Sequence, residues 1–406
     1  MQNDWKRMRF GDVVRFAEGL VDPRKRPYSD MVHLGPDNIA IGGARVVGKP
    51  MTAEALKLIS GKYLFDSCAI VYSKIRPNLN KVCIPGFEGI CSADMYPIWA
   101  DENIVDAKFL CHVMRGPVFV RGAVATSTRT GMPKINRFDL ENLSINVPTK
   151  QCQHRITELL DVWDDAVEKT TRLIVALEDR FGAFSLTLLR GRRRFSGDNS
   201  NWQSVSFNDV VQELTDRNSG RLGSDAVMGV NKLHGMIPMK DHVRAEDLSR
   251  YKIVPPNAFA YNPMRLNIGS LAMNMHGREV LVSPDYVAFA PREGHLNHRF
   301  FEHLRRSSIW SDFVSSAGSG SVRIRIYYEH LSAFSFHLPK LEVQSRIADM
   351  IDAAKREIDV HKEQVELMER QKRGLMQKLL TGEWRVPVRN SDVDAMAARV
   401  SEEAAQ

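Results

Sequence analysis

An internal duplication constrains the fold of this 406-residue chain more than any other feature of its sequence. The segment WKRMRFGDVV, which begins at Trp5, returns as WQSVSFNDVV at Trp202, a separation of 197 positions (202 − 5). From Ser92 and Ser283 onward the separation settles at 191 positions (283 − 92). Pairs matched in this region include His112 and His303, Pro148 and Pro339, Gln153 and Gln344, and Gly191 and Gly382. The two halves are therefore expected to share one architecture.

The first part of each copy differs in length between the copies. Residues 72–78 match residues 261–267 at a separation of 189 positions (261 − 72), so short insertions distinguish the copies. Insertions cost least in surface loops around a shared scaffold. Short β-branched and aromatic runs, such as residues 69–72 and 279–282, alternate with Gly, Pro and Asn turns. This pattern favours one α/β or α+β domain per copy.

The second part of each copy has the period of a long helix. After Pro148 and Pro339, apolar residues recur at alternating steps of four and three. Such a repeat, sustained over more than four heptads, predicts a coiled coil, and a polar residue at one seam position can fix its register. Thr170 and His361 hold that position, and Lys372 interrupts the apolar seam. The predicted helix-pairing residues are Ile156, Leu160, Trp163, Val167, Ile174, Leu177, Ile347, Ile351, Ile358, Val365, Met368 and Leu375.

The predicted fold class is α+β, with two similar α/β domains separated by a long antiparallel two-helix coiled coil and related by a pseudo-two-fold internal repeat. The expected boundaries are 1–150 for the first globular domain, 151–192 for the first helix, 193–201 for a linker, 202–340 for the second domain, 341–382 for the second helix and 383–406 for a tail.

Charge and cysteine usage narrow the class of protein. A net charge of +7 and a pI near 9.1 favour a polyanionic partner, because clustered Lys and Arg neutralise phosphates. The five cysteines form no C-x-x-C pair, which argues against a disulfide framework or a zinc site. The first residues lack the apolar core of a signal peptide, and no later stretch approaches a membrane span, so a cytoplasmic protein without membrane contact is expected.

Pairing of the two long helices predicts a symmetry that duplex DNA shares. The seam from Ile156 to Leu188 would span roughly 50 Å at about 1.5 Å per residue, with related domains in opposite directions at its ends. The strands of a DNA duplex are related by dyads, and its major groove returns to one side about every 34 Å. Two related but non-identical readers predict an asymmetric, bipartite DNA target.

Two local segments carry a resemblance to a known family. Residues 70–82, IVYSKIRPNLNKV, and residues 128–140, TRTGMPKINRFDL, are similar to the strand-and-turn and domain-closing segments of the specificity subunits of Type I restriction–modification enzymes. With the order of domain, helix, domain, helix, the resemblance covers nearly the whole chain. The second copy departs from it, with Leu266 where Pro77 stands and Ser321 to Ile326 in place of the GMPKI run.

The resemblance implies a chain without an active site or a cofactor of its own. It would bind double-stranded DNA and dock two modification subunits, which methylate adenine with S-adenosylmethionine, on its helices. Restriction subunits, which translocate and cut DNA with ATP and Mg²⁺, would join the complex in the prokaryotic cytoplasm. The domains would then be target-recognition domains.

Arg and Lys match the major-groove edge of guanine, and Asn and Gln match that of adenine. We therefore place candidate contacts in the turn after the matched Tyr strand and in the loop before each long helix, with solvated charges or phosphate contacts as the alternative for any single residue. The candidates are Lys74, Arg76, Asn78, Lys81, Arg129, Lys134, Asn262, Arg265, Asn267, Arg323 and Arg325.

The sequence gives little support for an enzyme active site or a metal site. Residues 43–50 have phosphate-loop spacing but carry Pro50 where Ser or Thr must bind magnesium, and no Asp/Asn-Pro-Pro-aromatic methyltransferase motif occurs. His295, His298 and His303 lack the spacing that would put three imidazoles on one helical face, so no metal is expected. Two alternatives remain: a coiled-coil protein-binding scaffold without DNA sequence preference, and a nuclease or fused restriction–methylation enzyme.

Overall fold

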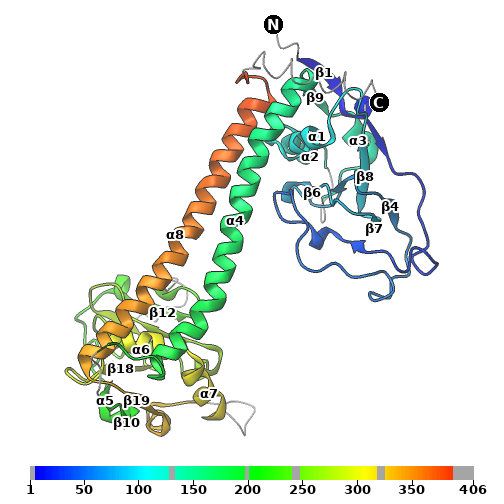
Figure 1. The fold of residues 1–406 in the computed structure, drawn as a ribbon. Coiled ribbons are helices and arrows are strands. Elements are labelled where there is room, and N and C mark those ends of the chain that lie inside the picture. The colour runs from blue at the N-terminus through cyan, green and yellow to red at the C-terminus, as the bar shows by residue number, and fades with distance from the viewer. Residues whose placement is uncertain (1–4, 128–132, 197–200, 240–246, 318–324, 387–406) are drawn as a thin grey trace. The chain divides into compact units, whose positions relative to one another are not determined.

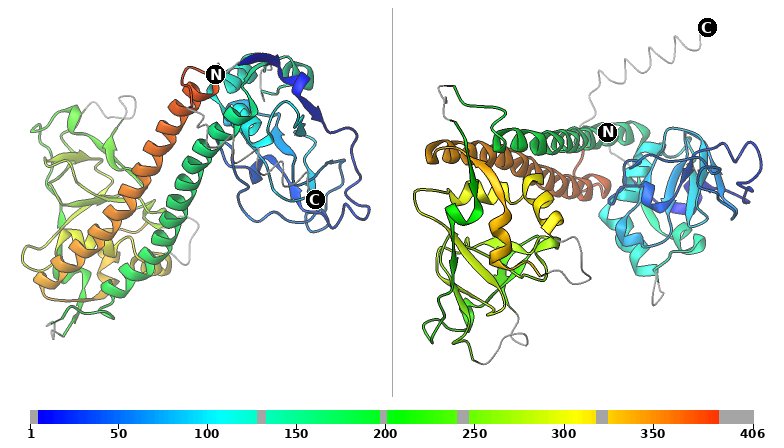
Figure 2. Two further views of the ribbon diagram at one scale, coloured as in Figure 1. Left: turned by 45° about the horizontal axis from the view of Figure 1, so that its top comes forward. Right: turned by 90° about the horizontal axis from the view of Figure 1, so that it is seen from below.

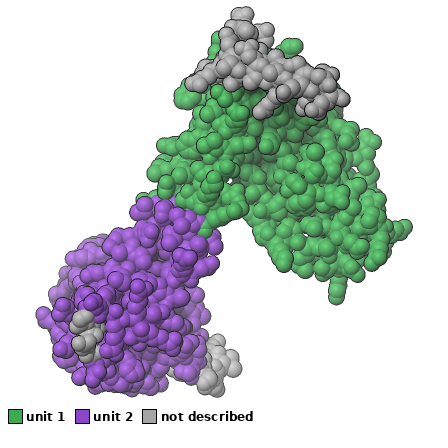
Figure 3. Space-filling view, viewed as in Figure 1, with its two compact units in different colours: residues 1–172, 363–406 green, residues 173–362 purple. Residues whose placement is uncertain are grey.

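The computed structural model describes residues 5–127, 133–196, 201–239, 247–317 and 325–386. The chain divides into two compact units, residues 1–172 with 363–406 and residues 173–362 (Figure 3). Both 40-residue helices, α4 (Lys150–Leu189) and α8 (Leu341–Leu380), contribute one segment to each unit. The expected ranges for these helices were 151–192 and 341–382. Each unit therefore contains one globular domain and parts of two long helices.

The globular domain of the first unit is a mixed α+β fold (Figure 1). Its four-stranded sheet has the order β2-β8-β5-β6, beside the three-stranded sheet β3-β7-β4 and the two-stranded pair β1-β9. The strands are β1 (Lys6–Arg9), β2 (Val14–Phe16), β3 (His33–Leu34), β4 (Tyr63–Phe65), β5 (Ile70–Ser73), β6 (Val82–Cys83), β7 (Gly89–Cys91), β8 (Met95–Ala100) and β9 (Ser144–Val147). The helices are α1 (Ala107–Arg115), α2 (Pro117–Thr126) and α3 (Arg137–Glu141).

The second unit repeats this plan. Its four-stranded sheet has the order β11-β18-β15-β16, and β10-β19 corresponds to β1-β9. The strands are β10 (Gln203–Ser206), β11 (Val211–Leu214), β12 (Met228–Asn231), β13 (Gly235–Pro238), β14 (Lys252–Val254), β15 (Phe259–Tyr261), β16 (Leu271–Met273), β17 (Val280–Val282), β18 (Val287–Pro291) and β19 (Ser335–Leu338). The helices are α5 (Phe207–Val210), α6 (His298–Leu304) and α7 (Ser308–Ala317). The four-stranded sheet and the helices α6 and α7, which match α1 and α2, thus follow the duplication, whereas the pairs β12-β13 and β14-β17 stand where the first unit has its three-stranded sheet.

Local sequence explains where the domain helices begin. Asp106 precedes α1 and accepts a hydrogen bond from the Phe109 backbone N–H, and Asn297 caps α6 in the same way. These caps satisfy backbone donors that have no partner inside a helix. Pro117 opens α2, a position where a missing N–H has no cost.

Each core lies between the four-stranded sheet and the helices that cover it. In the second unit Phe207, Phe289 and Phe301 are fully buried, with the Phe207 and Phe289 ring centres 5.2 Å apart. In the first unit the matched residues Phe10, Ile98 and Leu110 are also fully buried. Aromatic side chains bury large apolar areas, so these residues dominate the packing of each domain.

In each unit the two long-helix segments run side by side in opposite directions (Figures 1 and 2). In the first unit Asp164 of α4 forms an ion pair with Lys372 of α8. In the second unit Lys362 of α8 lies 2.6 Å from Glu178 of α4. No helix in the described part of the chain combines the length and the apolar character needed to cross a lipid bilayer.

The apolar seam predicted for the helices is turned away from solvent. All twelve predicted residues are buried or half-buried, among them Ile156, Leu160 and Ile351, each at most 1% exposed. Lys372, which interrupts the seam in the sequence, is itself 5% exposed. It is accommodated because Asp164 provides the opposite charge.

Candidate nucleic-acid interface

Two segments far apart in the sequence form one surface in the first domain. The turn after β5 is hydrogen-bonded to the segment before α3: the Ile135 backbone N–H donates to the Lys74 carbonyl at 2.9 Å, and the Arg76 N–H donates to the Pro133 carbonyl at 2.8 Å. Strand β5 is buried along its whole length, which fixes where the turn emerges. The strand-and-turn and domain-closing segments are therefore neighbours.

The second domain makes the corresponding contact. The Ile326 N–H donates to the Pro263 carbonyl at 3.0 Å, and these residues match Ile135 and Lys74 of the first domain. Arg265 and Asn267 are exposed on this turn, and Arg325 is exposed beside it. The Asn262 side chain accepts a hydrogen bond from the Met264 N–H, so it shapes the turn. We therefore assign Asn262 a structural role and keep the other three as candidate contacts.

The candidates of the first domain differ in accessibility. Arg76 and Asn78 are exposed at the short 3-10 turn Pro77–Leu79. Lys81 is not presented to a ligand, because its ammonium donates to the Pro36 carbonyl at 2.8 Å and its side chain is 11% exposed. The hypothesis that Lys81 contacts DNA is therefore withdrawn. Arg129 and Arg323 lie outside the described residues.

Lys74 and Lys134 form the electropositive part of this surface. The Lys74 Nζ atom lies 5.0 Å from the centre of the Tyr96 ring, and the Lys134 Nζ atom lies 3.4 Å from an Asp94 oxygen. Burial lowers the pKa of Lys74, and the nearby charge of Lys134 lowers it further. Two adjacent ammonium groups are stabilised by a polyanion, so this pair suits a phosphate contact.

A buried glutamine fixes each domain to its long helix. Gln153 of α4 accepts the Asp106 N–H at 2.7 Å and donates to the carbonyls of Ile104 and Pro148. Gln344 of α8 makes the same three contacts with Asn297, His295 and Pro339. Both glutamines are at most 1% exposed, so each amide satisfies backbone groups that water cannot reach.

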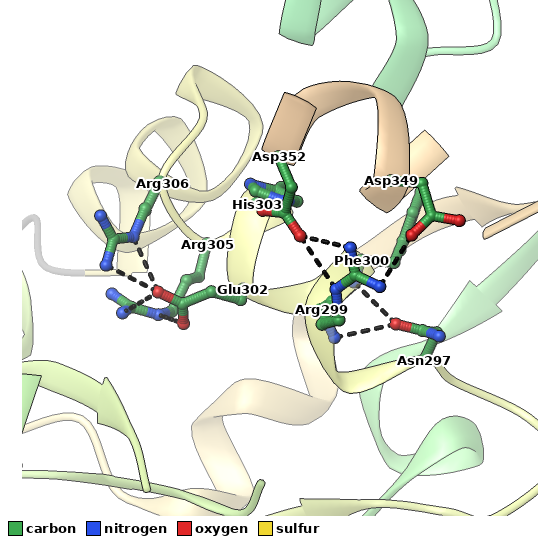
Figure 4. Close-up of polar contacts among 9 residues, drawn as sticks. All are labelled: Asn297, Arg299, Phe300, Glu302, His303, Arg305, Arg306, Asp349 and Asp352. Carbon is green, nitrogen blue, oxygen red and sulfur yellow. Dashed lines mark hydrogen bonds and ion pairs between the residues drawn. The ribbon is translucent and has the colours of Figure 1, made fainter. Parts of the chain in front are cut away.

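A histidine–aspartate pair repeats in both units. His112 Nε2 lies 2.8 Å from Asp161, and His303 Nε2 lies 2.9 Å from Asp352. Burial lowers the pKa of both histidines in spite of the adjacent carboxylates. In the second unit Arg299 strengthens the contact, with bonds to Asp349 and Asp352 on α8 (Figure 4).

The charged groups of the first unit have a different pattern. Arg115 at the end of α1 binds Asp164 through two hydrogen bonds of 2.8 Å, and Lys372 completes the group. His112, Asp161 and Asp164 place three ligand atoms within 4.8 Å of one another, the one such group within the described ranges. Because two cations already neutralise Asp164, we assign this group to an ionic network rather than to a metal site.

Comparison with known proteins shows what the first half of the chain is similar to. Residues 2–179 match the family described as the Type I restriction modification DNA specificity domain. The first globular domain and most of α4 are therefore similar to this family of DNA specificity domains. Among curated relatives, the Type I restriction enzyme EcoDI specificity subunit of Escherichia coli is 37% identical over 170 residues. That match covers 41% of this chain and spans 37% of the length of the E. coli specificity subunit.

Solved structures share the fold across both copies of the repeat. The HsdS subunit from Thermoanaerobacter tengcongensis aligns with a TM-score of 0.52 at 18% identity, covering 94% of this chain and 97% of that one. A chain of a type I R-M system aligns at 0.61 and 18%, covering 94% and 99%. The S subunit from M. genitalium aligns at 0.52 and 13%, covering 93% and 96%. The specificity-subunit fold therefore extends beyond the matched residues 2–179.

Sequence reasoning missed the side chains that hold each globular domain to its long helix. Gln153 and Gln344, and His112 and His303, were visible as identical residues at the 191-position separation (344 − 153). A polar residue retained in both copies within an apolar pattern is the signal that points to a buried hydrogen bond. Asp164 gave no such signal, because the second copy has Lys355 in its place. Arg115 is matched by Arg306, but no matched carboxylate pointed to its partner.

Proposed function

We propose that this chain is the DNA-reading subunit of a Type I restriction–modification complex and that it recognises an asymmetric, bipartite target. The observation that carries the proposal is the paired surface, in which the turn and the closing segment meet in each of two related domains. The match of residues 2–179 to the Type I restriction modification DNA specificity domain supports the same role. The proposal assigns one half-site to each domain.

The chemistry of the exposed side chains fits base readout. Arg76 and Asn78 in the first domain, and Arg265 and Asn267 in the second, occupy the same places on their turns. Arginine pairs with the O6 and N7 atoms of guanine, and asparagine with the N6 and N7 atoms of adenine. The residues around them differ between the domains, so we infer two half-sites of different sequence.

We assign catalysis to partner subunits. The sequence has no Asp/Asn-Pro-Pro-aromatic motif of amino-methyltransferases, and its phosphate-loop-like segment carries Pro50. Adenine methylation would come from two modification subunits with S-adenosylmethionine. Cleavage would come from restriction subunits with ATP and Mg²⁺. The proposed place of action is the prokaryotic cytoplasm, where the target DNA lies.

The outward faces of the long helices are the proposed docking surface for the modification subunits. Leu159 on α4 is 44% exposed, and its counterpart Met350 on α8 is 40% exposed. Val162, one turn from Leu159, is 67% exposed. Apolar residues gathered on one helix face indicate a protein partner, because they gain by leaving water. Leu159→Glu and Met350→Glu are expected to reduce recovery of modification subunits with the tagged chain.

Selection from a randomised DNA duplex library tests the reading function. The full-length chain, in the presence of unspecific competitor DNA, is expected to enrich two short conserved motifs separated by a spacer of fixed length. Enrichment without any base preference would contradict the proposal and favour the coiled-coil scaffold. Methylation or cleavage by the chain alone would favour the fused-enzyme alternative.

A further inference from the structure

The turn that carries Arg76 and Asn78 is hydrogen-bonded to the C-terminal end of α1. Asn80 follows the turn with a φ of 47°, and its side-chain amide donates to the Arg115 carbonyl at 2.9 Å. The Gly42 N–H donates to the Leu79 carbonyl at 3.0 Å, and the Arg115 Nε atom lies 3.3 Å from the Gly42 carbonyl. The turn is thus attached to Arg115 both directly and through residue 42.

Arg115 connects this turn to both long helices. Its side chain is 9% exposed and binds Asp164 of α4 through two hydrogen bonds of 2.8 Å. Asp164 also forms an ion pair with Lys372 of α8, whose side chain is 7% exposed. A bidentate arginine–carboxylate pair fixes orientation as well as distance, so the turn, α4 and α8 are linked by direct polar contacts.

The second domain lacks this connection. Gly269 occupies the place of Asn80, with a φ of 90°, and has no side chain to donate. Arg306, which corresponds to Arg115, follows α6 and binds Glu302 of that helix at 2.8 Å (Figure 4). Lys355 stands where Asp164 stands in the first unit. The molecule therefore contains one anchored turn and one turn without this anchor, which serves as an internal control.

We propose that Asn80, Arg115 and Asp164 are positioning residues that set the orientation of the Arg76–Asn78 turn relative to α4 and α8, and thereby determine base discrimination in the first half-site. This inference rests on the proposed function. It predicts that changes on the helix pair near Asp164 alter reading by the first domain and leave reading by the second domain unchanged.

The decisive variant is Asn80→Gly, which gives the first domain the residue of the second. Glycine adopts positive φ without strain, so the backbone of the turn is preserved while the contact with the Arg115 carbonyl is lost. Base selection by the full-length variant on a randomised duplex library is expected to show a roughly two- to thirtyfold loss of discrimination in the first half-site. Discrimination in the second half-site is expected to stay at the wild-type level.

Two further variants separate positioning from stability. Arg115→Gln removes the bond to Asp164 and is expected to act on the same half-site, whereas Arg306→Gln is the matched control and should leave first-half discrimination unchanged. An unchanged first half-site in Asn80→Gly, or an equal loss in both half-sites, would overturn the inference. Failure of the wild-type chain to select any sequence would instead remove the proposed function.

Discussion

Trp5 packs against Gly382, so the first residues of the first domain lie on the end of the last helix. A Cβ atom placed on Gly382 would come within 2.9 Å of the Trp5 Cε2 atom. Trp202 lies on Gly191 in the same way, with a closest approach of 3.1 Å. Each domain thus begins on the end of a long helix. For the first domain that helix is α8, so the beginning of the chain packs against the end of its last helix.

Gly382→Ala is expected to destabilise the first unit. Gly382 has a φ of 77°, which an alanine adopts only with strain, and the added methyl group would also collide with the indole. We expect a loss of about 1–3 kcal/mol in the free energy of unfolding, measured by denaturant titration. Gly374→Ala is the matched control. It lies in α8 with nothing within 4 Å of the new Cβ, and should be neutral or stabilising. Equal losses in both variants would contradict this account.

The buried glutamines should be costly to replace. Gln153→Met keeps the size of the side chain but leaves the Asp106 N–H and the carbonyls of Ile104 and Pro148 without their partner. Unsatisfied buried polar groups cost about 1–3 kcal/mol each, so the first unit is expected to lose at least about 2 kcal/mol. Gln344→Met should act equally on the second unit. Limited proteolysis with mass spectrometry identifies the unit that opens; a wild-type digestion pattern would argue against this role.

Much of the fold could be predicted, because it follows from the internal duplication of the sequence and from the helical spacing of its apolar residues. The 191-position separation (344 − 153) located both domains, and the steps of four and three located α4 and α8. The candidate surface could be predicted only as two segments, because which side chain engages another depends on packing. Lys81 is an example, since its ammonium donates a hydrogen bond to the carbonyl of Pro36, which lies 45 positions away in the sequence.

The ionic network at Asp164 should respond unequally to removal of its members. Asp164→Asn would remove the carboxylate that pairs directly with the buried Arg115 and Lys372 cations, and we expect a loss of about 3 kcal/mol. Lys372→Met is expected to change stability by less than about 1 kcal/mol. It restores an apolar residue to the seam, and Asp164 keeps its arginine partner. Thermal and denaturant unfolding of the two variants measure the difference; a greater loss for Lys372→Met would contradict the assignment.

Acid should destabilise the protein through its two buried histidines. The pKa of His112 and of His303 is lowered by burial relative to the ordinary value of 6.5. Below pH 6.5 the unfolded chain therefore binds more protons than the folded chain, and the free energy of unfolding falls as the pH decreases. Melting temperatures between pH 7.5 and 5.5 measure this fall. His112→Gln should make it shallower than in the wild type, whereas the same change at exposed His154 should not; an unaltered slope in His112→Gln would argue against the assignment.

The most direct test of the account changes one reading surface at a time. Full-length Arg76→Ala/Asn78→Ala and Arg265→Ala/Asn267→Ala variants are each used to select sequences from a randomised duplex library, at a fixed salt concentration. The first variant is expected to lose about 1–3 kcal/mol of discrimination per changed contact in one half-site only, and the second variant in the other half-site only. If either pair of substitutions altered both half-sites, or neither, the claim that each domain reads its own half of the target would be contradicted.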